Sequence, residues 1–273
     1  MNWSRAKTIL IALLLAVDVF LLVVYISRDN GVRKDEMALR DDVCAILSAQ
    51  GIGVDEEIIP LDSVGIRPAV LQRKTDMQNA AVSFFGKVAE EKNGENITYS
   101  GEGGSIMFSN DAFSLVYESG KNIENEDEAK VLAKAVAGSF AVTGGLRDYT
   151  CRSDEGGYTI GISQMFSGVP VFDCGIEVKV SVTGSVIASG KFIGKGVRVT
   201  TDGKVMKTSA LMLSFADGAV EKGLCPLKIS SVTLGYISKT PAGGRVSMTP
   251  TLCLMTDKGV FYVDMQSGKF SGI

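Results

Sequence analysis

The chain has 273 residues, and its 28 Lys and Arg residues are nearly balanced by 31 Asp and Glu residues, for a formal net charge of −3. This mild acidity argues against a nucleic-acid-binding protein, which needs a basic surface. The absence of histidine excludes Ser-His-Asp and Cys-His catalysis and every histidine-ligated metal site. The five cysteines are scattered and form no C-x-x-C pair. We predict that they are small side chains of the core, and one or two disulfides between them stay open.

The N-terminus indicates a membrane segment. A basic tail at residues 1–7 precedes an apolar run at residues 8–27. About 20 helical residues at about 1.5 Å each match a hydrocarbon core of about 30 Å. A cleaved signal peptide has a shorter apolar core and a small residue at its cleavage site, whereas this run ends near Tyr25. We therefore predict a single transmembrane helix at residues 8–27, with the tail cytoplasmic and the remainder extracellular.

One ionisable residue, Asp18, lies near the middle of this run. An Asp costs about 2.5–3.5 kcal/mol at the centre of a membrane helix, and intramembrane carboxylates usually face a polar partner. We predict that Asp18 faces another membrane helix; the alternative is an Asp that the apolar run simply tolerates. The expected partner-binding surface around Asp18 consists of Leu14, Leu22 and Tyr25, with the small residues Ala12 and Ala16 on an adjoining face.

Residues 28–120 predict a first ectodomain lobe. Apolar residues recur at helical spacing from Leu39 to Leu47, which indicates an amphipathic helix within residues 30–50. A second helix, with an apolar face from Met77 to Val88, follows Asp76. Short strands are expected at residues 58–61, 69–71, 96–100, 105–109 and 112–117.

Residues 121–273 predict a second ectodomain lobe made of two similar units. The first unit, about residues 121–203, starts with Asn125 and Glu128, which resemble a capping box. The inward face of the helix that follows is expected to contain Val131, Leu132, Ala135, Val136 and Phe140. An antiparallel meander comes next, and it is expected to end in one long strand at residues 186–199.

The second unit, about residues 204–273, repeats this order. A helix starting at Thr208 or Ser209 precedes strands at residues 229–238, 248–256 and 260–265. The predicted fold class is therefore α+β: a single N-terminal transmembrane helix followed by an ectodomain of duplicated helix-plus-antiparallel-meander units.

The N-terminal residues resemble those of the YycI family. Met1-Asn2-Trp3-Ser4-Arg5-Ala6-Lys7-Thr8-Ile9, an apolar run and Asp18-Val19-Phe20-Leu21-Leu22 match its start, chiefly at Trp3, Lys7, Thr8 and Phe20. Weaker similarity runs through residues 164–172 and 259–264, but Pro250-Thr251-Leu252 departs from a P-x-W pattern. The resemblance implies a non-enzymatic, single-pass regulator in the cell membrane of Gram-positive bacteria. Such a protein acts with a YycH-like protein on the sensor histidine kinase YycG, also called WalK, in the YycG/YycF (WalK/WalR) two-component system.

The sequence predicts no catalytic residue, cofactor site or metal site. The glycines and lysines from Gly190 to Gly196 fail the spacing of a phosphate loop and lie in a predicted strand. The acidic residues at 124–128 are explained by the dipole of the helix that starts there. Pairs of catalytic groups that meet only in space stay open.

These observations favour a membrane-anchored regulator that modulates a sensor kinase through transmembrane and ectodomain contacts. The alternative is a membrane-tethered module that binds a peptide or wall fragment at a sheet edge or interlobe groove. A tethered hydrolase is a third reading. The sign of the effect on the kinase, a sensed ligand and homo- or hetero-oligomerisation stay open.

Overall fold

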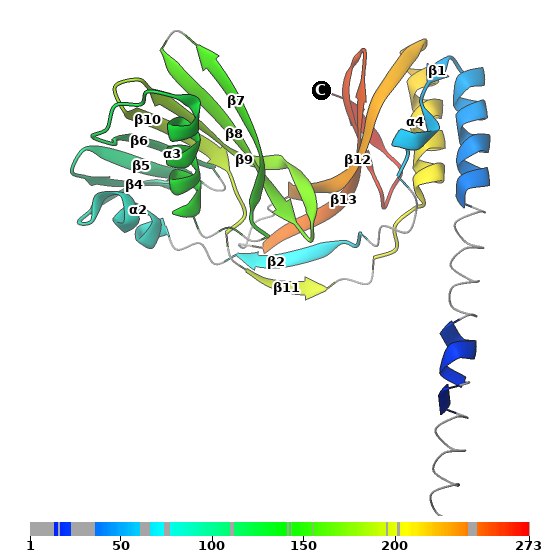
Figure 1. Cartoon of the computed structure of the whole chain (residues 1–273), viewed down its shortest axis with the longest axis horizontal. Helices are drawn as coiled ribbons and strands as arrows, with labels where there is room; N and C mark the ends of the chain where they lie inside the picture. The colour runs from blue at the N-terminus through cyan, green and yellow to red at the C-terminus, as the bar shows by residue number, and fades with distance from the viewer. Residues whose placement is uncertain are drawn as a thin grey trace, which may run out of the picture.

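A computed structural model describes residues 14–15, 17–22, 36–60, 66–73, 77–109, 112–140, 142, 144–154, 156–194, 196–200, 203–239 and 245–272 (Figure 1). Residues 36–49 are helical. The elements that follow are β1 (Ile52–Gly53), the 3-10 helix η1 (Glu56–Ile58), β2 (Ala69–Arg73), α2 (Met77–Phe85), β3 (Ala89–Asn93), β4 (Asn96–Gly101), β5 (Gly104–Ser109), β6 (Ala112–Glu118), α3 (Glu126–Gly138), β7 (Leu146–Asp154), β8 (Gly157–Phe166), β9 (Val169–Ser181), β10 (Ser185–Lys191), β11 (Gly196–Thr200), α4 (Thr208–Glu221), β12 (Leu227–Lys239), β13 (Arg245–Thr256), β14 (Gly259–Asp264) and β15 (Phe270–Gly272).

The strands are connected into one mixed sheet of fifteen strands. Its main path has the order β11-β2-β13-β12-β9-β10-β6-β5-β4-β3, and the other strands attach to β8, β9, β12, β13 and β14. Most neighbours are antiparallel. The exceptions are β1 beside β12 and the junction where Tyr236 of β12 lies opposite Val171 of β9 in parallel.

The predicted fold class, duplicated helix-plus-meander units behind a transmembrane helix, is wrong. The predicted meanders do not stay separate, because β9 pairs with β12 and β10 pairs with β6. These long-range pairings satisfy backbone groups that an isolated meander would leave at its edges. Across the described ranges, no helix combines the length and apolar character needed to cross a membrane. Residues 1–13, 16 and 23–35, which include most of the predicted anchor, lie outside the described part of the chain.

Two buried clusters define two lobes. The central lobe, drawn from residues 77–192, packs α2 and α3 against one face of the antiparallel strands β3 to β10. Phe166, Val171 and Cys174 lie within this range but are buried in the other cluster. The C-terminal lobe, residues 36–73 and 193–272, packs the 36–49 helix and α4 against β12, β13 and β14. Figure 1 shows these two groups of helices at opposite ends of the molecule. Each cluster contains residues from both sides of residue 120, where the boundary between the ectodomain lobes was predicted.

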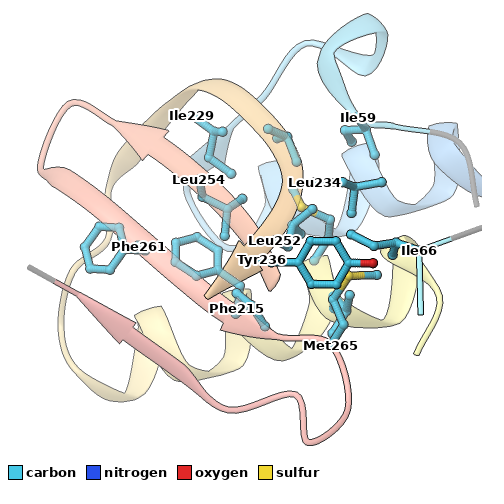
Figure 2. Packing of buried hydrophobic residues seen from close by; sticks show 14 of the residues in the cluster. Ile59, Ile66, Phe215, Ile229, Leu234, Tyr236, Leu252, Leu254, Phe261 and Met265 are labelled. Carbon is cyan, nitrogen blue, oxygen red and sulfur yellow. The ribbon is translucent and has the colours of Figure 1, made fainter. Parts of the chain in front are cut away.

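Phe215, Tyr236 and Phe261 pack among aliphatic side chains in the core of the C-terminal lobe (Figure 2). The ring of Phe215 on α4 lies 5.6 Å from that of Phe261 and 5.5 Å from that of Phe270. Tyr236 is 1% exposed, and its hydroxyl donates a hydrogen bond of 2.9 Å to the carbonyl of Arg67. Burying each such side chain contributes about 1.5–3 kcal/mol, so this cluster fixes the lobe around α4.

The central lobe is an insertion in the C-terminal lobe. β2 pairs with β11 so that Arg73 lies opposite Gly196 and Ala69 lies opposite Thr200. The chain therefore enters and leaves the central lobe at neighbouring points. The predicted single strand at residues 186–199 is accordingly broken: Phe192 is buried in the central cluster, whereas Ile193 is buried in the other.

Candidate functional site

The strand β9 passes from one lobe into the other. Val171 and Cys174 are buried in the C-terminal cluster, whereas Ile176, Val178 and Val180 are buried in the central cluster. The alternation of buried and outward side chains is interrupted between Val171 and Cys174, where Phe172 and Asp173 are only half-buried. We call this part of β9, Phe172 and Asp173 together with the residues that they contact on neighbouring strands, the seam.

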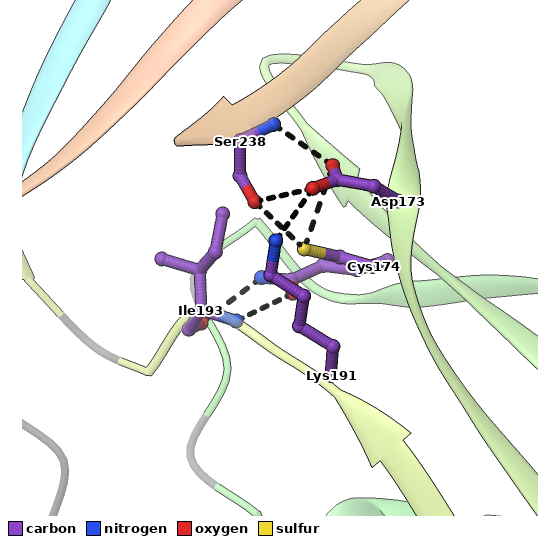
Figure 3. A network of polar contacts seen from close by, with 6 residues as sticks. Asp173, Cys174, Lys191, Ile193 and Ser238 are labelled. Atoms are coloured by element: carbon purple, nitrogen blue, oxygen red, sulfur yellow. Dashed lines mark hydrogen bonds and ion pairs between the residues drawn. The ribbon is translucent and has the colours of Figure 1, made fainter. Parts of the chain in front are cut away.

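Asp173 is the centre of the polar contacts at the seam (Figure 3). Its Oδ1 accepts a hydrogen bond of 2.8 Å from the backbone N–H of Ser238. Its Oδ2 accepts from the Ser238 hydroxyl at 2.8 Å and from the Lys191 ammonium at 2.6 Å. The side chains of Lys191 and Asp173 are 32% and 29% exposed, so water partly screens this ion pair. One carboxylate thereby ties together β9, β10 and β12.

A buried amide holds the adjoining crossover between β10 and β11. Gln164 is 1% exposed. Its side-chain oxygen accepts a hydrogen bond of 2.8 Å from the Ile193 N–H, and its nitrogen donates one of 3.0 Å to the Ile193 carbonyl. Since buried backbone groups need partners, Gln164 fixes the place where the chain leaves the central lobe.

An aromatic pair completes the seam. The ring of Phe172 lies 5.5 Å from that of Tyr262 on β14. Phe172 also covers Gly235, where an added Cβ would come within 2.6 Å of the ring. Burial is the main cause of the raised pKa of Tyr262, with smaller contributions from Cys253 and Asp173. The phenol is therefore a hydrogen-bond donor at neutral pH rather than a phenolate.

A hollow of about 530 Å³ adjoins the seam on the face of the sheet opposite α3. Its position follows from the alternation on β8 and β9, because Ile160, Ile162 and Ile176 point into the central cluster and their neighbours point outward. The lining includes hydroxyl, glycine, aromatic and charged residues: Thr150, Gly161, Ser163, Phe172, Asp173, Gly175, Glu177, Ser189 and Lys191.

A larger hollow of about 830 Å³ lies beside the start of α3. Its apolar lining includes Val131, which is 68% exposed, and its rim is acidic. Local structure explains much of this rim. Asn125 Oδ1 accepts from the Glu128 N–H at 3.0 Å, and Glu128 accepts from the Glu124 N–H at 3.0 Å. These acidic residues are explained by the capping and the dipole of α3, so they do not by themselves indicate a ligand. The seam is therefore the better candidate site.

The predicted partner-binding surface lies only partly in the described residues. Leu14, Asp18 and Leu22 of this surface are helical and exposed, as is Phe20 of the family motif. The other residues of the surface, Ala12, Ala16 and Tyr25, and of the motif, Trp3, Lys7 and Thr8, lie outside the described part of the chain. The role of this surface in binding a partner stays a prediction.

Sequence patterns did not indicate Asp173 or Ser238, and they drew attention to Lys191 only within a possible phosphate loop. These residues meet through strand pairings that local patterns do not reveal, although the interrupted alternation before Cys174 was a usable signal. Within the described ranges, no group of three or more Cys, Asp and Glu side chains is placed to hold a metal ion. All five cysteines are free thiols, and burial raises the pKa of Cys253, so its thiol stays protonated at neutral pH.

Comparisons with known proteins show the fold alone. No family model matches the chain, and no curated protein matches it. An uncharacterized protein from Eubacterium rectale has a similar structure with a TM-score of 0.54 and 11% identity, over 76% of this chain and 86% of that one. The C-terminal domain of YpeB from Bacillus megaterium matches with a TM-score of 0.33 and 11% identity, over 74% of this chain and 99% of that domain. The first shares the fold, and the second is too dissimilar to add to the argument.

Proposed function

We propose that this chain is a non-enzymatic regulator, attached to the cell membrane through its N-terminal apolar segment, that modulates a sensor histidine kinase of a cell-envelope two-component system. Its partners in this proposal are the kinase and a YycH-like protein in the same membrane. The resemblance of the N-terminal residues to the YycI family supports this choice of partners.

The observation that carries the proposal is the exposure of the apolar side chains at residues 14–22. Leu14, Phe20 and Leu22 are 54%, 66% and 58% exposed, and the other large apolar side chains described in this segment are 46–61% exposed. The rest of the described chain has its own filled clusters, which contain none of these residues. Because each exposed apolar side chain forfeits about 1.5–3 kcal/mol of burial, lipid or a partner helix is the expected environment.

Asp18 provides the test of this proposal. The kinase would be co-expressed with wild type, Asp18→Asn or Asp18→Leu and recovered from membranes through an affinity tag on the chain. A polar contact between membrane helices contributes about 0.6–2 kcal/mol, so Asp18→Leu should lower kinase recovery about threefold to thirtyfold. Asp18→Asn should fall between, because the amide keeps hydrogen bonding. The free energy of placing Leu in lipid is lower than that of placing Asp there, and Asn removes the charge, so both variants should stay in the membrane fraction.

Phe20→Leu is the matched control, since it changes a neighbouring exposed side chain without changing polarity. It should leave kinase recovery close to that of wild type. Release of the wild-type chain by carbonate would refute membrane attachment. Failure of the wild type to recover any kinase would refute the regulatory function, and equal recovery with all three residues at position 18 would refute the role of Asp18.

A second candidate function is a tethered module that binds a peptide or wall fragment. The hollow beside the seam is the specific observation in its favour, because its volume is within the range of about 300–1,000 Å³ that is typical of ligand sites. Retention of the chain by purified wall material, with no recovery of a kinase, would favour this function over regulation.

A further inference from the structure

We infer that the hollow beside the seam binds an uncharged, hydroxyl-rich ligand, namely a short neutral oligosaccharide. This inference rests on the second candidate function, the binding module, and does not depend on the kinase.

Two outward-facing glycines create the depression. Gly161 of β8 lies opposite Glu177 of β9, and Gly175 of β9 lies opposite Ser163 of β8, so the glycines are diagonal neighbours. An added Cβ at Gly161 would lie 2.7 Å from the Thr150 hydroxyl oxygen. Register shifts adjoin both glycines: one lies in the β7–β8 pair between Arg147 and Thr150, which is opposite Gly161, and the other lies in the β8–β9 pair just beyond Ser163, which is opposite Gly175. Glycine inside a strand marks such an irregularity or the close approach of a ligand or another backbone, so the glycines account for the shape of the hollow and its lining decides the class of ligand.

The charged groups at the hollow are matched in pairs. Lys191 lies 2.6 Å from Asp173, and Lys179 lies 3.5 Å from Glu177. A charged ligand would therefore meet a compensating charge only by breaking one of these pairs. The charge distribution favours a ligand without net charge.

The remaining polar side chains are hydroxyls. Thr150, Ser163 and Ser189 line the hollow from β7, β8 and β10. A hydroxyl both donates and accepts hydrogen bonds, so this lining matches a ligand that also does both. A polyol has this property at every hydroxyl group.

An aromatic ring lies at the seam end of the hollow. Phe172 lines it and is held in place by the contacts with Tyr262 and Gly235. The negative face of an aromatic ring attracts weakly positive C–H groups. A sugar ring presents such groups on its faces and hydroxyls around its rim, which suits Phe172 together with the hydroxyl side chains.

Strand addition by a peptide is not available on the two strands that form the floor of the hollow. β8 lies between β7 and β9, and β9 lies between β8 and β10, so their backbone groups are already in sheet ladders. Recognition over β8 and β9 must therefore use side chains, whereas a peptide bound as an added strand needs a free edge, which among the described strands at the hollow is the outer edge of β7. Over β8 and β9 this topology favours a saccharide over an extended peptide.

The test measures binding of defined neutral oligosaccharides to the full chain, solubilised without a sugar-headed detergent. The probes are chitotetraose, cellotetraose and maltotetraose, measured by calorimetry and by ligand-observed NMR. Purified wall sacculi form a separate pelleting assay that tests whether the saccharide source is the wall. Binding of at least one probe is expected, with little change between low and high salt, because no net charge is neutralised.

Two tryptophan variants locate the site. Ser189→Trp places a large side chain in the hollow and should weaken binding by about tenfold or more. Ser100→Trp makes the same change on the same face of the sheet, on β4, and should leave affinity unchanged. Both serines are exposed and lie in strands, where Trp is well tolerated, so both variants should fold.

The outcomes separate the inference from the proposed functions. No binding of any oligosaccharide, equal weakening by both Trp variants, or strong salt dependence would overturn the inference. If sacculi retain the chain but no neutral oligosaccharide binds, the module stands and the ligand class is wrong. If Ser189→Trp abolishes kinase recovery and no oligosaccharide binds, the hollow is a protein contact and the inference fails.

Discussion

Substitution of Asp173 by Ala should destabilise the protein by about 2–4 kcal/mol. The largest part comes from Ser238, which is 4% exposed and whose N–H loses its acceptor at 2.8 Å. A buried donor without a partner costs about 1–3 kcal/mol. The Ser238 hydroxyl loses less, because Cys174 Sγ lies 3.4 Å away and remains as a partner. Lys191 adds about 0.2–1 kcal/mol, since its side chain is 32% exposed and water replaces the carboxylate.

Graded variants separate these contributions. Asp173→Asn keeps an oxygen acceptor for the Ser238 N–H and should cost about 1–2 kcal/mol. Lys191→Met keeps the apolar stem and removes the ammonium group of the partly exposed ion pair, so it should cost no more than about 1 kcal/mol. Urea unfolding of the full chain in nonionic detergent, followed by far-UV circular dichroism, gives each change in the free energy of unfolding. Asp217→Ala, at an exposed position on α4, is the control and should change it by less than about 0.5 kcal/mol. A cost for Lys191→Met equal to that of Asp173→Ala would refute the reasoning, because it would place the energy in the ion pair instead of the buried N–H.

Two further predictions follow from the ionisable groups. The hydrogen bond from Lys130 lowers the pKa of Glu126 in the folded protein. The pair should therefore stabilise the fold fully above about pH 4.3, the ordinary pKa of Glu. This stabilisation should be lost as the pH falls through the lower pKa of the folded state. The difference in Tm between wild type and Glu126→Gln should therefore persist at neutral pH and vanish in strong acid; a difference that grows in acid would contradict it. Cys174 and Cys253 are 4% and 8% exposed free thiols, so a maleimide should label them only after unfolding. Mass spectrometry of the unreduced, denatured chain should show labels on all five cysteines, and fewer would indicate a disulfide.

Local patterns in the sequence predicted the local structure well. The Asn125 cap of α3 is confirmed by its hydrogen bond from the Glu128 N–H. The strands predicted at residues 96–100, 105–109 and 112–117 correspond to β4, β5 and β6, and the helix predicted at Thr208 is α4. Each of these elements depends on contacts between residues close in sequence, which is why spacing alone could find them.

Two local expectations were wrong for reasons of packing. Val131 was expected to face inward, but it is 68% exposed, and α3 buries a stripe of small residues that includes Ala129 and Ala133. Val136, which was also expected to face inward, is buried beside these alanines, so the buried face of α3 is rotated away from Val131. Residues 58–61 were expected to form a strand, but the 3-10 helix η1 ends at Ile58, and of the described residues 58–60 only Ile59 is buried.

The seam could not be predicted in this way. Asp173 and Ser238 are brought together by the junction of β9 with β12, and the importance of Gly161 and Gly175 depends on the register of β8 and β9. These are pairings between distant segments, and a strand's own alternation does not specify which strand lies beside it. Spatial information was needed to recognise the candidate site.

The insertion of the central lobe has a consequence for the order in which the chain folds. β3, β4 and β5 each pair with the next strand in sequence, so these contacts can form as soon as both strands have been synthesised. Leu47, in contrast, is buried in the same cluster as Leu211, about 160 residues later. At about 5–20 residues per second, the ribosome takes about 8–30 s to make that partner. The middle of the chain therefore acquires its native contacts first, and the two ends close around it last.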